Sequence, residues 1–305
     1  MNQSKPILEL DHVSKSYQAV EAVKDLSFSV KAGEIFGLLG PNGAGKTTTI
    51  RMALDIIKPT AGEIAVLGGP MSEAKKERIG YLPEERGLYD DMTLLDTLLY
   101  MGQLKGLSRQ TAQERVESYL QEVELWDARD RKIEALSRGM KQKAQFVAGT
   151  MHNPELIIID EPFSGLDPVN TRIIKSLLYR MRDRGAAIIM STHQMHQVEE
   201  MCERILLIDH GERVLYGRLE DIRQQYATNA VEVDLQGTLE AVPGVKQLTP
   251  RNGGYRMVLQ KGAESGDVLH FLVNMPDITV ERFERVQVSL DEIFVQAVSD
   301  GEETP

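Results

Sequence analysis

The eight residues from Gly40 to Thr47 have the types and spacing that are needed to hold phosphate groups. Their sequence, GPNGAGKT, matches the pattern G-x-x-x-x-G-K-[ST] at every fixed position. Glycines let backbone N–H groups point into one concavity, a lysine can reach the outer phosphates of a nucleoside triphosphate, and a threonine hydroxyl can contact Mg²⁺. A glycine-rich turn with a chance lysine is the alternative. The predicted nucleotide-binding residues here are Gly40, Pro41, Asn42, Gly43, Ala44, Gly45, Lys46, Thr47 and Thr48.

Two carboxylates follow the apolar run at residues 156–159. An acid at the end of a strand can hold Mg²⁺, and a second acid beside it can polarise a water that attacks the outermost phosphate. We therefore assign Asp160 to the metal and Glu161 to the role of base. An acidic turn after a buried strand is the alternative, and the phosphate loop argues against it.

The flanks of the phosphate loop predict the elements that position it. Residues 35–39 form a short apolar run typical of a buried strand, and residues 48–57 carry apolar residues at helical spacing until Pro59 prevents continuation. The loop therefore lies between a strand and a helix. The positive end of the helix dipole adds to the attraction for phosphate.

Composition limits the class of protein. The chain has 305 residues, 42% hydrophobic and 27% charged, which is typical of a soluble globular protein with room for two domains. A net charge of -11 without a basic stripe argues against a nucleic-acid partner. Cys202 is the only cysteine, so we expect no disulfide within the chain and a reducing cytoplasm. No run approaches the ~20 apolar residues that span a bilayer, so we expect membrane contact only through a partner.

The rest of the chain alternates between strand and helix patterns. We predict an α/β protein with a first domain at residues 1–225 and a small α/β accessory domain at 226–305. The pattern is helical over about residues 88–150, which indicates a helical insertion. Outside the insertion, the first domain is predicted to contain strands near 7–10, 26–30, 63–67, 156–159 and 186–190, helices at 172–184 and 218–226, and a hairpin turn at residues 210–211.

The last eighty residues contain no nucleotide motif. Segments 231–235 and 255–259 are predicted strands that flank the turn at 251–254, and residues 268–273 are a predicted helix. Ser289 and Glu292 form a capping-box pattern that opens an apolar helix through Val298.

The segment LSRGMKQ at residues 136–142 resembles the L-S-G-G-Q signature of ATP-binding cassette (ABC) proteins. Ser137 and Gly139 match, whereas Arg138 and Met140 depart from it. The phosphate loop, this segment, the acidic strand, SGLD at 164–167 and STH at 191–193 follow one another in the order of that family. The resemblance covers residues 7 to about 225. It implies a P-loop ABC nucleotide-binding fold with a mixed sheet core, an antiparallel β subdomain and a helical insertion.

The resemblance also assigns roles to individual residues. Tyr17 stands where the family stacks an aromatic ring on adenine, although a surface tyrosine is the alternative. Glu84 replaces a glutamine that contacts Mg²⁺ or its water, although a solvated acidic turn is possible. His193 matches the histidine that reaches the γ-phosphate. The resemblance and the residues together give catalytic roles to Glu161, His193 and Lys46, metal contacts to Thr47, Glu84 and Asp160, and nucleotide contacts across a dimer to Ser137, Gly139 and Asp167.

By resemblance, the chain binds ATP and Mg²⁺ as a head-to-tail homodimer or cassette heterodimer and powers a separate transmembrane permease. This implies a cytoplasmic location, at the inner face of the plasma membrane. VSLDEIF at residues 288–294 resembles the end of subunits in the drug- and sodium-export group, which favours export. The alternatives are a soluble ABC switch that acts on ribosomes, DNA or another complex, and a nucleotide-binding regulator without turnover. Ribosomal members usually have two cassettes, and DNA-repair members carry coiled coils or zinc motifs, none of which is recognised here.

Overall fold

The computed structural model describes residues 5–18, 20–84, 87–226, 229–260, 262–286 and 288–302. It divides the chain into two compact units, Met1–Leu219 and Glu220–Pro305. The helix α8 (Leu219–Gln225) begins at this division, and the boundary expected from the sequence lies at its end.

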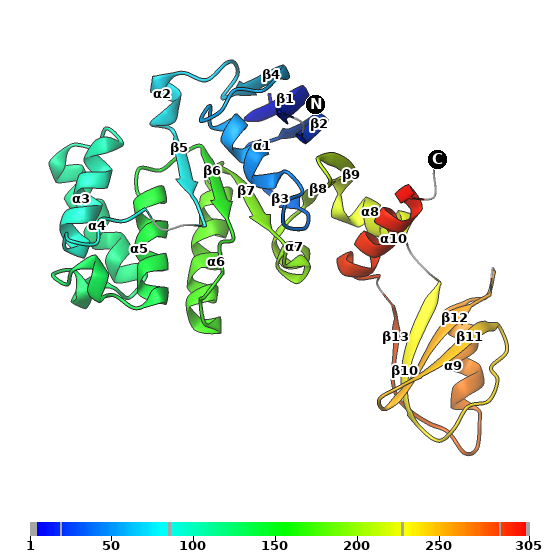
Figure 1. Ribbon diagram of the computed structural model, residues 1–305. Helices are drawn as coiled ribbons and strands as arrows, with labels where there is room; N and C mark the ends of the chain where they lie inside the picture. The colour runs from blue at the N-terminus through cyan, green and yellow to red at the C-terminus, as the bar shows by residue number, and fades with distance from the viewer. Residues whose placement is uncertain are drawn as a thin grey trace. The chain divides into compact units, whose positions relative to one another are not determined.

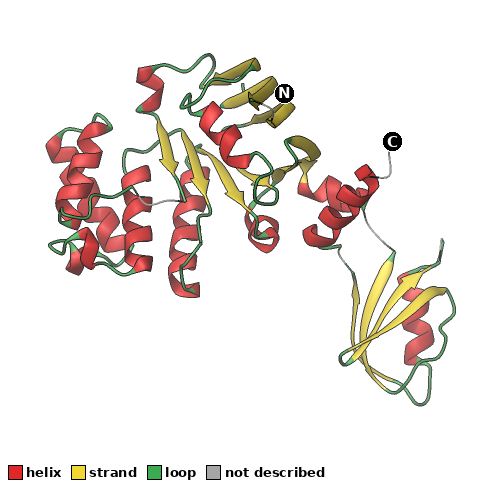
Figure 2. Ribbon diagram, viewed as in Figure 1, coloured by secondary structure: helices red, strands yellow, loops and turns green. Residues whose placement is uncertain are grey.

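A six-stranded sheet in the order β5-β6-β7-β3-β8-β9 forms the centre of the first unit (Figures 1 and 2). Adjacent strands of this sheet are parallel, except that β8 and β9 form an antiparallel hairpin that turns at His210 and Gly211. Every residue of β3, β6 and β7 is buried, as parallel strands covered on both faces require. The strands are β3 (Ile35–Leu39), β5 (Ile79–Leu82), β6 (Leu156–Asp160), β7 (Ala187–Thr192), β8 (Arg204–Asp209) and β9 (Glu212–Arg218).

A three-stranded antiparallel sheet in the order β2-β1-β4 packs with this centre. Its strands are β1 (Leu8–Tyr17), β2 (Val20–Val30) and β4 (Ala61–Val66). Helix α1 (Lys46–Ala53) contributes Ile50 and Met52 to one apolar core shared with both sheets. The helix that follows the phosphate loop is therefore fixed between two sheets. The mixed sheet and the antiparallel subdomain expected from the sequence are both present.

The helices of the insertion pack on one another. α3 (Leu94–Leu104), α4 (Arg109–Glu122) and α5 (Arg138–Thr150) are in mutual contact and bury the apolar positions that the helical spacing predicted, including Leu98 and Leu120. Side-chain caps fix where these helices begin, because Thr93 and Ser108 accept from Asp96 N and Thr111 N. The other helices of the first unit are α2 (Glu73–Lys76), η1 (Trp126–Ala128), η2 (Ile133–Ala135), α6 (Pro168–Asp183) and α7 (Met195–Met201).

The second unit has a four-stranded antiparallel sheet in the order β11-β12-β10-β13, and helix α9 packs against one of its faces. Ser289 and Glu292 form the predicted capping box, since Glu292 N donates to Ser289 Oγ (3.2 Å) and Ser289 N to Glu292 Oε2 (3.1 Å). The elements are β10 (Ala230–Gln236), β11 (Val245–Arg251), β12 (Gly254–Leu259), β13 (Thr279–Arg285), α9 (Ser265–Val273) and α10 (Leu290–Glu302).

One pairing in this unit was predicted wrongly. The turn at residues 251–254 joins β11 to β12, and not β10 to β12 as expected. Strands β11 and β13 were not predicted, because both lie at the edges of the sheet, where charges and a proline such as Pro250 are tolerated and the apolar alternation is weak. Within the described residues, no helix is long and apolar enough to cross a membrane.

Candidate functional site

The predicted phosphate loop, Asp160, Glu161 and His193 gather at the carboxyl ends of three parallel strands. β3 leads into the phosphate loop, β6 ends at Asp160 and β7 ends at Thr192. The register pairs Leu39 with Thr192 and Asp160 with Ser191. Side chains that are far apart in the sequence therefore lie at one edge of the sheet, which is where open α/β folds bind ligands.

Two glycines of the phosphate loop occupy positions that no other residue fits. Gly40 has a φ of +147°, and a Cβ there would lie 2.1 Å from Ile208 O. Gly45 has a φ of +107°, and a Cβ would lie 2.6 Å from Ala22 O. The loop is thus pressed against the backbone of β2 and β8, while Pro41, Asn42 and Gly43 remain exposed at its tip. Ala44 and Lys46 are buried, Thr47 is exposed and Thr48 is half-buried.

Lys46 lies buried at the start of α1. Its Nζ donates to Gly40 O (2.7 Å) and Pro41 O (3.0 Å), so the lysine closes its own loop. Burial lowers the pKa of Lys46, while the carboxylates of Glu161, Asp160 and Glu84 act in the opposite direction. The loop therefore holds a cation close to the carboxylates of Asp160 and Glu161.

Asp160 is buried at the end of β6, and its Oδ2 lies 3.5 Å from Thr47 Oγ1. Burial is the largest influence on this carboxyl and raises its pKa. A carboxylate held in a site that disfavours its charge, beside a hydroxyl oxygen, is a donor set that a hard divalent cation fits.

Glu161 is held rigidly beside Asp160. Its φ of +51° is unusual for a residue with a side chain, and strained backbone of this kind is often found at active sites. Oε1 accepts from His193 N (3.0 Å) and lies 2.6 Å from His193 Nδ1, while Oε2 accepts from Thr192 Oγ1 (3.0 Å). The structure thus joins the predicted base to the predicted histidine, whose ring remains more than half exposed.

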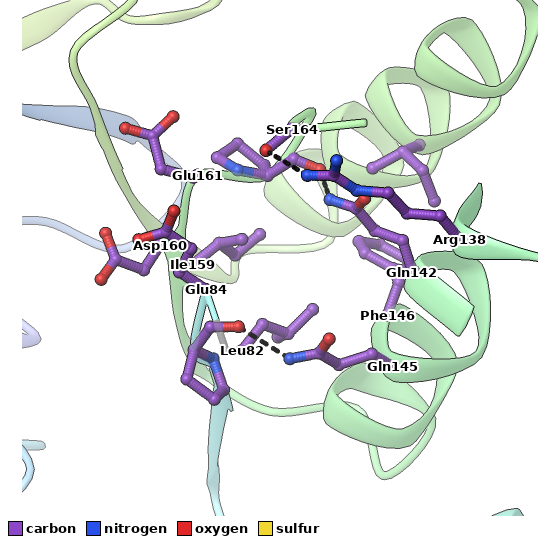
Figure 3. A pocket seen from close by; sticks show the side chains of 13 residues that line it. Leu82, Glu84, Arg138, Gln142, Gln145, Phe146, Ile159, Asp160, Glu161 and Ser164 are labelled. Atoms are coloured by element: carbon purple, nitrogen blue, oxygen red, sulfur yellow. Dashed lines mark hydrogen bonds between the residues drawn. The ribbon is translucent and has the colours of Figure 1, made fainter. Parts of the chain in front are cut away.

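A cavity of 340 Å³ lies beside the two acids (Figure 3). Asp160 and Glu161 form one wall, and side chains of α5 form the opposite wall. Glu84 also lines the cavity, and Gln145 Nε2 donates to the preceding carbonyl, Pro83 O (2.7 Å). The loop after β5 is therefore held next to the carboxylates. Other residues that line the cavity are Leu82, Arg138, Gln142, Phe146, Ile159, Pro162, Ser164 and Ile174.

A family model described as ABC transporter matches residues 23–164, and one described as ATP-binding protein DrrA1-3-like, C-terminal domain, matches residues 217–298. The uncharacterized ABC transporter ATP-binding protein YhaQ of Bacillus subtilis is 36% identical over 96% of this chain and 98% of its own length. The chain belongs to the ABC transporter ATP-binding proteins. Members of this family are ATPases, so the chain is an ATP-binding, ATP-hydrolysing subunit of an ABC transporter.

Other similarities to the family extend over most of the chain. The linearmycin resistance ATP-binding protein LnrL of Bacillus subtilis is 34% identical over 93% of this chain and 89% of its own. A solved ATP-binding subunit of an ABC transporter superposes with a TM-score of 0.68, at 33% identity, over 72% of this chain and 93% of that chain. The structure of cbiO1 from Clostridium perfringens, part of the ABC transporter complex cbiONQ, gives a TM-score of 0.64 at 25% identity, over 73% of this chain and 92% of that one.

Three predicted nucleotide contacts of this ABC subunit, Ser137, Asp167 and Tyr17, are engaged within their own elements. Ser137 caps α5 by accepting from Met140 N (3.3 Å), and Asp167 caps α6 by accepting from Asn170 N (2.9 Å). Tyr17 lies exposed at the end of β1, with Lys15 Nζ 5.1 Å from its ring centroid. Among the described residues, neither Ser137 nor Gly139 lines the cavity that holds Asp160 and Glu161.

Two residues that the sequence reasoning missed belong to the site of this ABC subunit. Gln142 Nε2 donates to Pro162 O (3.0 Å), and Gln145 Nε2 donates to Pro83 O. Both amides project from α5 into the cavity, as Figure 3 shows. Their spacing of three residues on a predicted helix was the available signal, because it places both side chains on one face.

Proposed function

We propose that this ABC subunit powers export through a separate transmembrane permease, by Mg²⁺-dependent ATP hydrolysis in a head-to-tail dimer. The observation that carries the proposal is the edge of the sheet where Lys46, Asp160, Glu161 and His193 converge. A cation, a buried metal-type carboxylate and a base joined to a histidine are the groups that phosphoryl transfer to water requires.

Mg²⁺ would be held by the Thr47 hydroxyl, the Asp160 carboxylate and Glu84. These are hard oxygen donors, and Asp160 is a buried carboxyl that a divalent cation would compensate. When bound, Mg²⁺ neutralises charge on the phosphate oxygens. Lys46 adds a second positive charge at the same site, and Gly43 at the tip of the loop is exposed, with no atom within 4 Å of an added Cβ.

Glu161 is the proposed general base. It would accept a proton from the attacking water while its Oε1 remains joined to His193 Nδ1. His193 would contact the γ-phosphate through its exposed ring, and Thr192 keeps the carboxylate oriented. Because both carboxylate oxygens are fixed by partners on β7 and just after it, the base is preorganised for the reaction.

The dimer would complete each nucleotide site from the partner subunit. Ser137 is exposed, and a Cβ at Gly139 would meet only Leu166 Cδ2 within 4 Å among the described atoms, at 3.8 Å. The start of α5 is therefore open to a phosphate, and its dipole favours negative charge. Asp167 is proposed to lie at the dimer contact, and Tyr17 to stack on adenine.

The proposed permease contact is formed by the helical insertion and the Glu84 loop, and a groove of 290 Å³ lies beside them, lined by Ile56, Ile79, Tyr81 and Lys105, among others. This groove joins the end of α1 and strand β5 to the end of α3. Ile56, which lines this groove, is more than half exposed, as an apolar side chain at a docking surface would be. A permease there would place the subunit at the cytoplasmic face of the plasma membrane.

Export is favoured by the relatives. One relative is a linearmycin resistance ATP-binding protein, and another, the Nod factor export ATP-binding protein I of Bradyrhizobium diazoefficiens, is 35% identical over 76% of this chain and 78% of its own. We propose that the accessory domain at residues 226–305 regulates or stabilises the dimer. Deletion of residues 227–305 without effect on assembly or ATP turnover would contradict that role.

The test is to tag the Glu161→Gln chain and extract host membranes in mild detergent with Mg²⁺ and ATP. We expect a polytopic membrane protein to co-purify in stoichiometric amount. Lys46→Ala is the matched control, because it weakens phosphate binding at the same site and should recover less of the partner. Recovery of only soluble complexes with the Glu161→Gln chain would contradict the permease and support a cytosolic switch.

A further inference from the structure

Arg138 occupies an electrostatically unfavourable position. It is the first residue of α5, where the helix dipole disfavours a cation, and no acidic residue lies in the first turn of this helix. Arg138 also replaces the first of the two glycines in the L-S-G-G-Q signature, whereas Gly139 matches the second. We therefore expect another contact of this side chain to offset its unfavourable interaction with the helix dipole.

That contact is the loop that follows Glu161. Arg138 Nη2 donates to Ser164 Oγ at 3.3 Å. The side chain also lies against the backbone of Gly165, where an added Cβ would approach Arg138 Nε to 2.4 Å, Cζ to 2.8 Å and Cδ to 3.0 Å. Gly165, whose φ is +78°, thus leaves the space that the arginine fills, and a side chain there would require the arginine to shift.

Other donors on the same side of α5 reinforce this connection. Gln142, one turn after Arg138, donates to Pro162 O, and Gln145 donates to Pro83 O in the loop after β5. Figure 3 shows the three side chains projecting from α5 into one cavity. Helix α5 is therefore joined to the loop that carries the predicted base and to the loop that carries Glu84.

We propose that Arg138 is a positioning residue for ATP hydrolysis. It ties the signature turn at residues 137–139 to the loop that follows Glu161 in the same subunit. The signature turn, which would donate to the nucleotide bound by the partner subunit, and Glu161, the base of this subunit's own site, then move as one body. Closure of the dimer at one nucleotide site is therefore transmitted to the other site. This inference rests on the proposed dimer. It assigns a role to a residue by which this chain departs from the family signature.

The first test compares Arg138→Ala and Arg138→Lys with wild type. Arg138 is exposed, so we expect little change in thermal stability. We expect kcat for ATP to fall about tenfold in Arg138→Ala, because a misplaced catalytic group is costly even when it is retained. Affinity of the monomer for a fluorescent ATP analogue should stay within twofold, since the phosphate loop is unchanged. Arg138→Lys should recover part of kcat, because an ammonium group can still donate to Ser164 Oγ.

The second test places a methyl group where the arginine lies. We expect Gly165→Ala to lower kcat as Arg138→Ala does, and the double variant to be no slower than either single variant. Gly185→Ala is the matched control, because Gly185 has a φ of +100° with no atom within 4 Å of a Cβ. It adds backbone strain without a clash, and its kcat should stay within twofold of wild type.

Two outcomes would overturn the inference and leave the proposed function standing. The first is an unchanged kcat in both single variants although wild type dimerises with ATP, and the second is a double variant in which the two losses of kcat multiply. Light scattering in the presence of ATP shows whether wild type dimerises, and so it separates these outcomes from failure of the proposed function. If wild type hydrolyses ATP as a monomer, the proposed dimer is wrong and the inference is overturned with it.

Discussion

The first unit buries charged side chains where its parallel strands end, whereas the second unit pairs its charges across a sheet face. Lys46, Asp160 and Glu161 are all buried. Among the residues of the second unit whose burial is described, Ser265 is the one buried polar side chain. Charges there form partly exposed pairs, such as Arg251 of β11 with Glu232 of β10 at 3.3 Å across the sheet, and Arg256 of β12 with Glu292 of α10 at 2.9 Å.

The backbone differs in the same way. Every described non-glycine residue with a positive φ lies in the first unit, and Glu161 is one of them. Buried charge and the strained backbone of Glu161 both reduce stability, and they occur together at the end of β6, beside the groups proposed for catalysis. The comparison assigns catalysis to the first unit and predicts that substitutions in the two units affect different properties.

The largest expected effect is that of Glu161→Gln on turnover. The amide cannot accept a proton, so we expect phosphate release to fall about 100-fold or more. Trp126 is the only tryptophan and lies in the first unit, so its fluorescence can verify that this unit remains folded. Glu155→Gln is the control, because Glu155 is a half-exposed partner of Arg78 at the beginning of the same strand. Equal rates for the two variants would remove Glu161 from the mechanism.

Two glycine substitutions test the separation of the units directly. At Gly40 an added Cβ would lie 2.1 Å from Ile208 O, and at Gly254 it would lie 1.9 Å from Val233 O. Both backbones must shift, which costs on the order of 2 kcal/mol. We expect Gly40→Ala to lower the Trp126 unfolding midpoint and nucleotide affinity. Gly254→Ala should destabilise the second unit, as measured by hydrogen exchange of its strands. It should leave the Trp126 unfolding midpoint and the nucleotide affinity unchanged.

Gly68→Ala serves as the control for Gly40→Ala. Gly68 lies outside the phosphate loop and has a φ of +80° with no atom within 4 Å of a Cβ, so only backbone strain of about 1 kcal/mol is added. If Gly68→Ala lost as much nucleotide affinity as Gly40→Ala, contact with β8 would not be the reason that Gly40 is required.

The positions of the candidate site residues in the first unit could be predicted from the sequence better than the strand pairing of the second unit. The phosphate loop and the Asp160–Glu161 pair could be placed because their identities and spacing are dictated by phosphate and strand geometry. The edge strands β11 and β13 could not, since only pairing with β12 and β10 makes them strands. The bonds from Gln142 and Gln145 depend on how α5 packs against two loops, which no local pattern encodes.

Asp160→Asn should separate stability from function within the first unit. Because burial raises the pKa of Asp160 in the folded state, its ionisation disfavours folding at neutral pH. We expect the variant to unfold with a free energy on the order of 1 kcal/mol higher at pH 7. This gain in stability should shrink as the pH falls toward the ordinary aspartate pKa of about 3.9, because the wild-type carboxyl is then protonated and neutral like the amide. ATP turnover should be lost. Urea titrations followed by Trp126 fluorescence test this, and a less stable variant at pH 7 would contradict it.

The smallest effect, and the one of opposite sign, is expected for Glu292→Gln in the second unit. The hydrogen bond from Arg256 is the largest influence on Glu292 and lowers its pKa. The pair therefore stabilises the fold at pH values above the ordinary glutamate pKa, and this stabilisation is lost as the pH falls through the lowered pKa of Glu292. Because the pair is partly exposed, we expect a loss of less than about 1 kcal/mol at neutral pH.

Glutamine can preserve the capping box with Ser289, so the substitution isolates the ion pair. Hydrogen exchange of the α10 amides should quicken at pH 7, and added salt should reduce the difference from wild type because it screens an exposed pair. ATP turnover should not change. A gain in stability at neutral pH would show that Glu292, like Asp160, is penalised by its surroundings, and the contrast between the two units would fail at this residue.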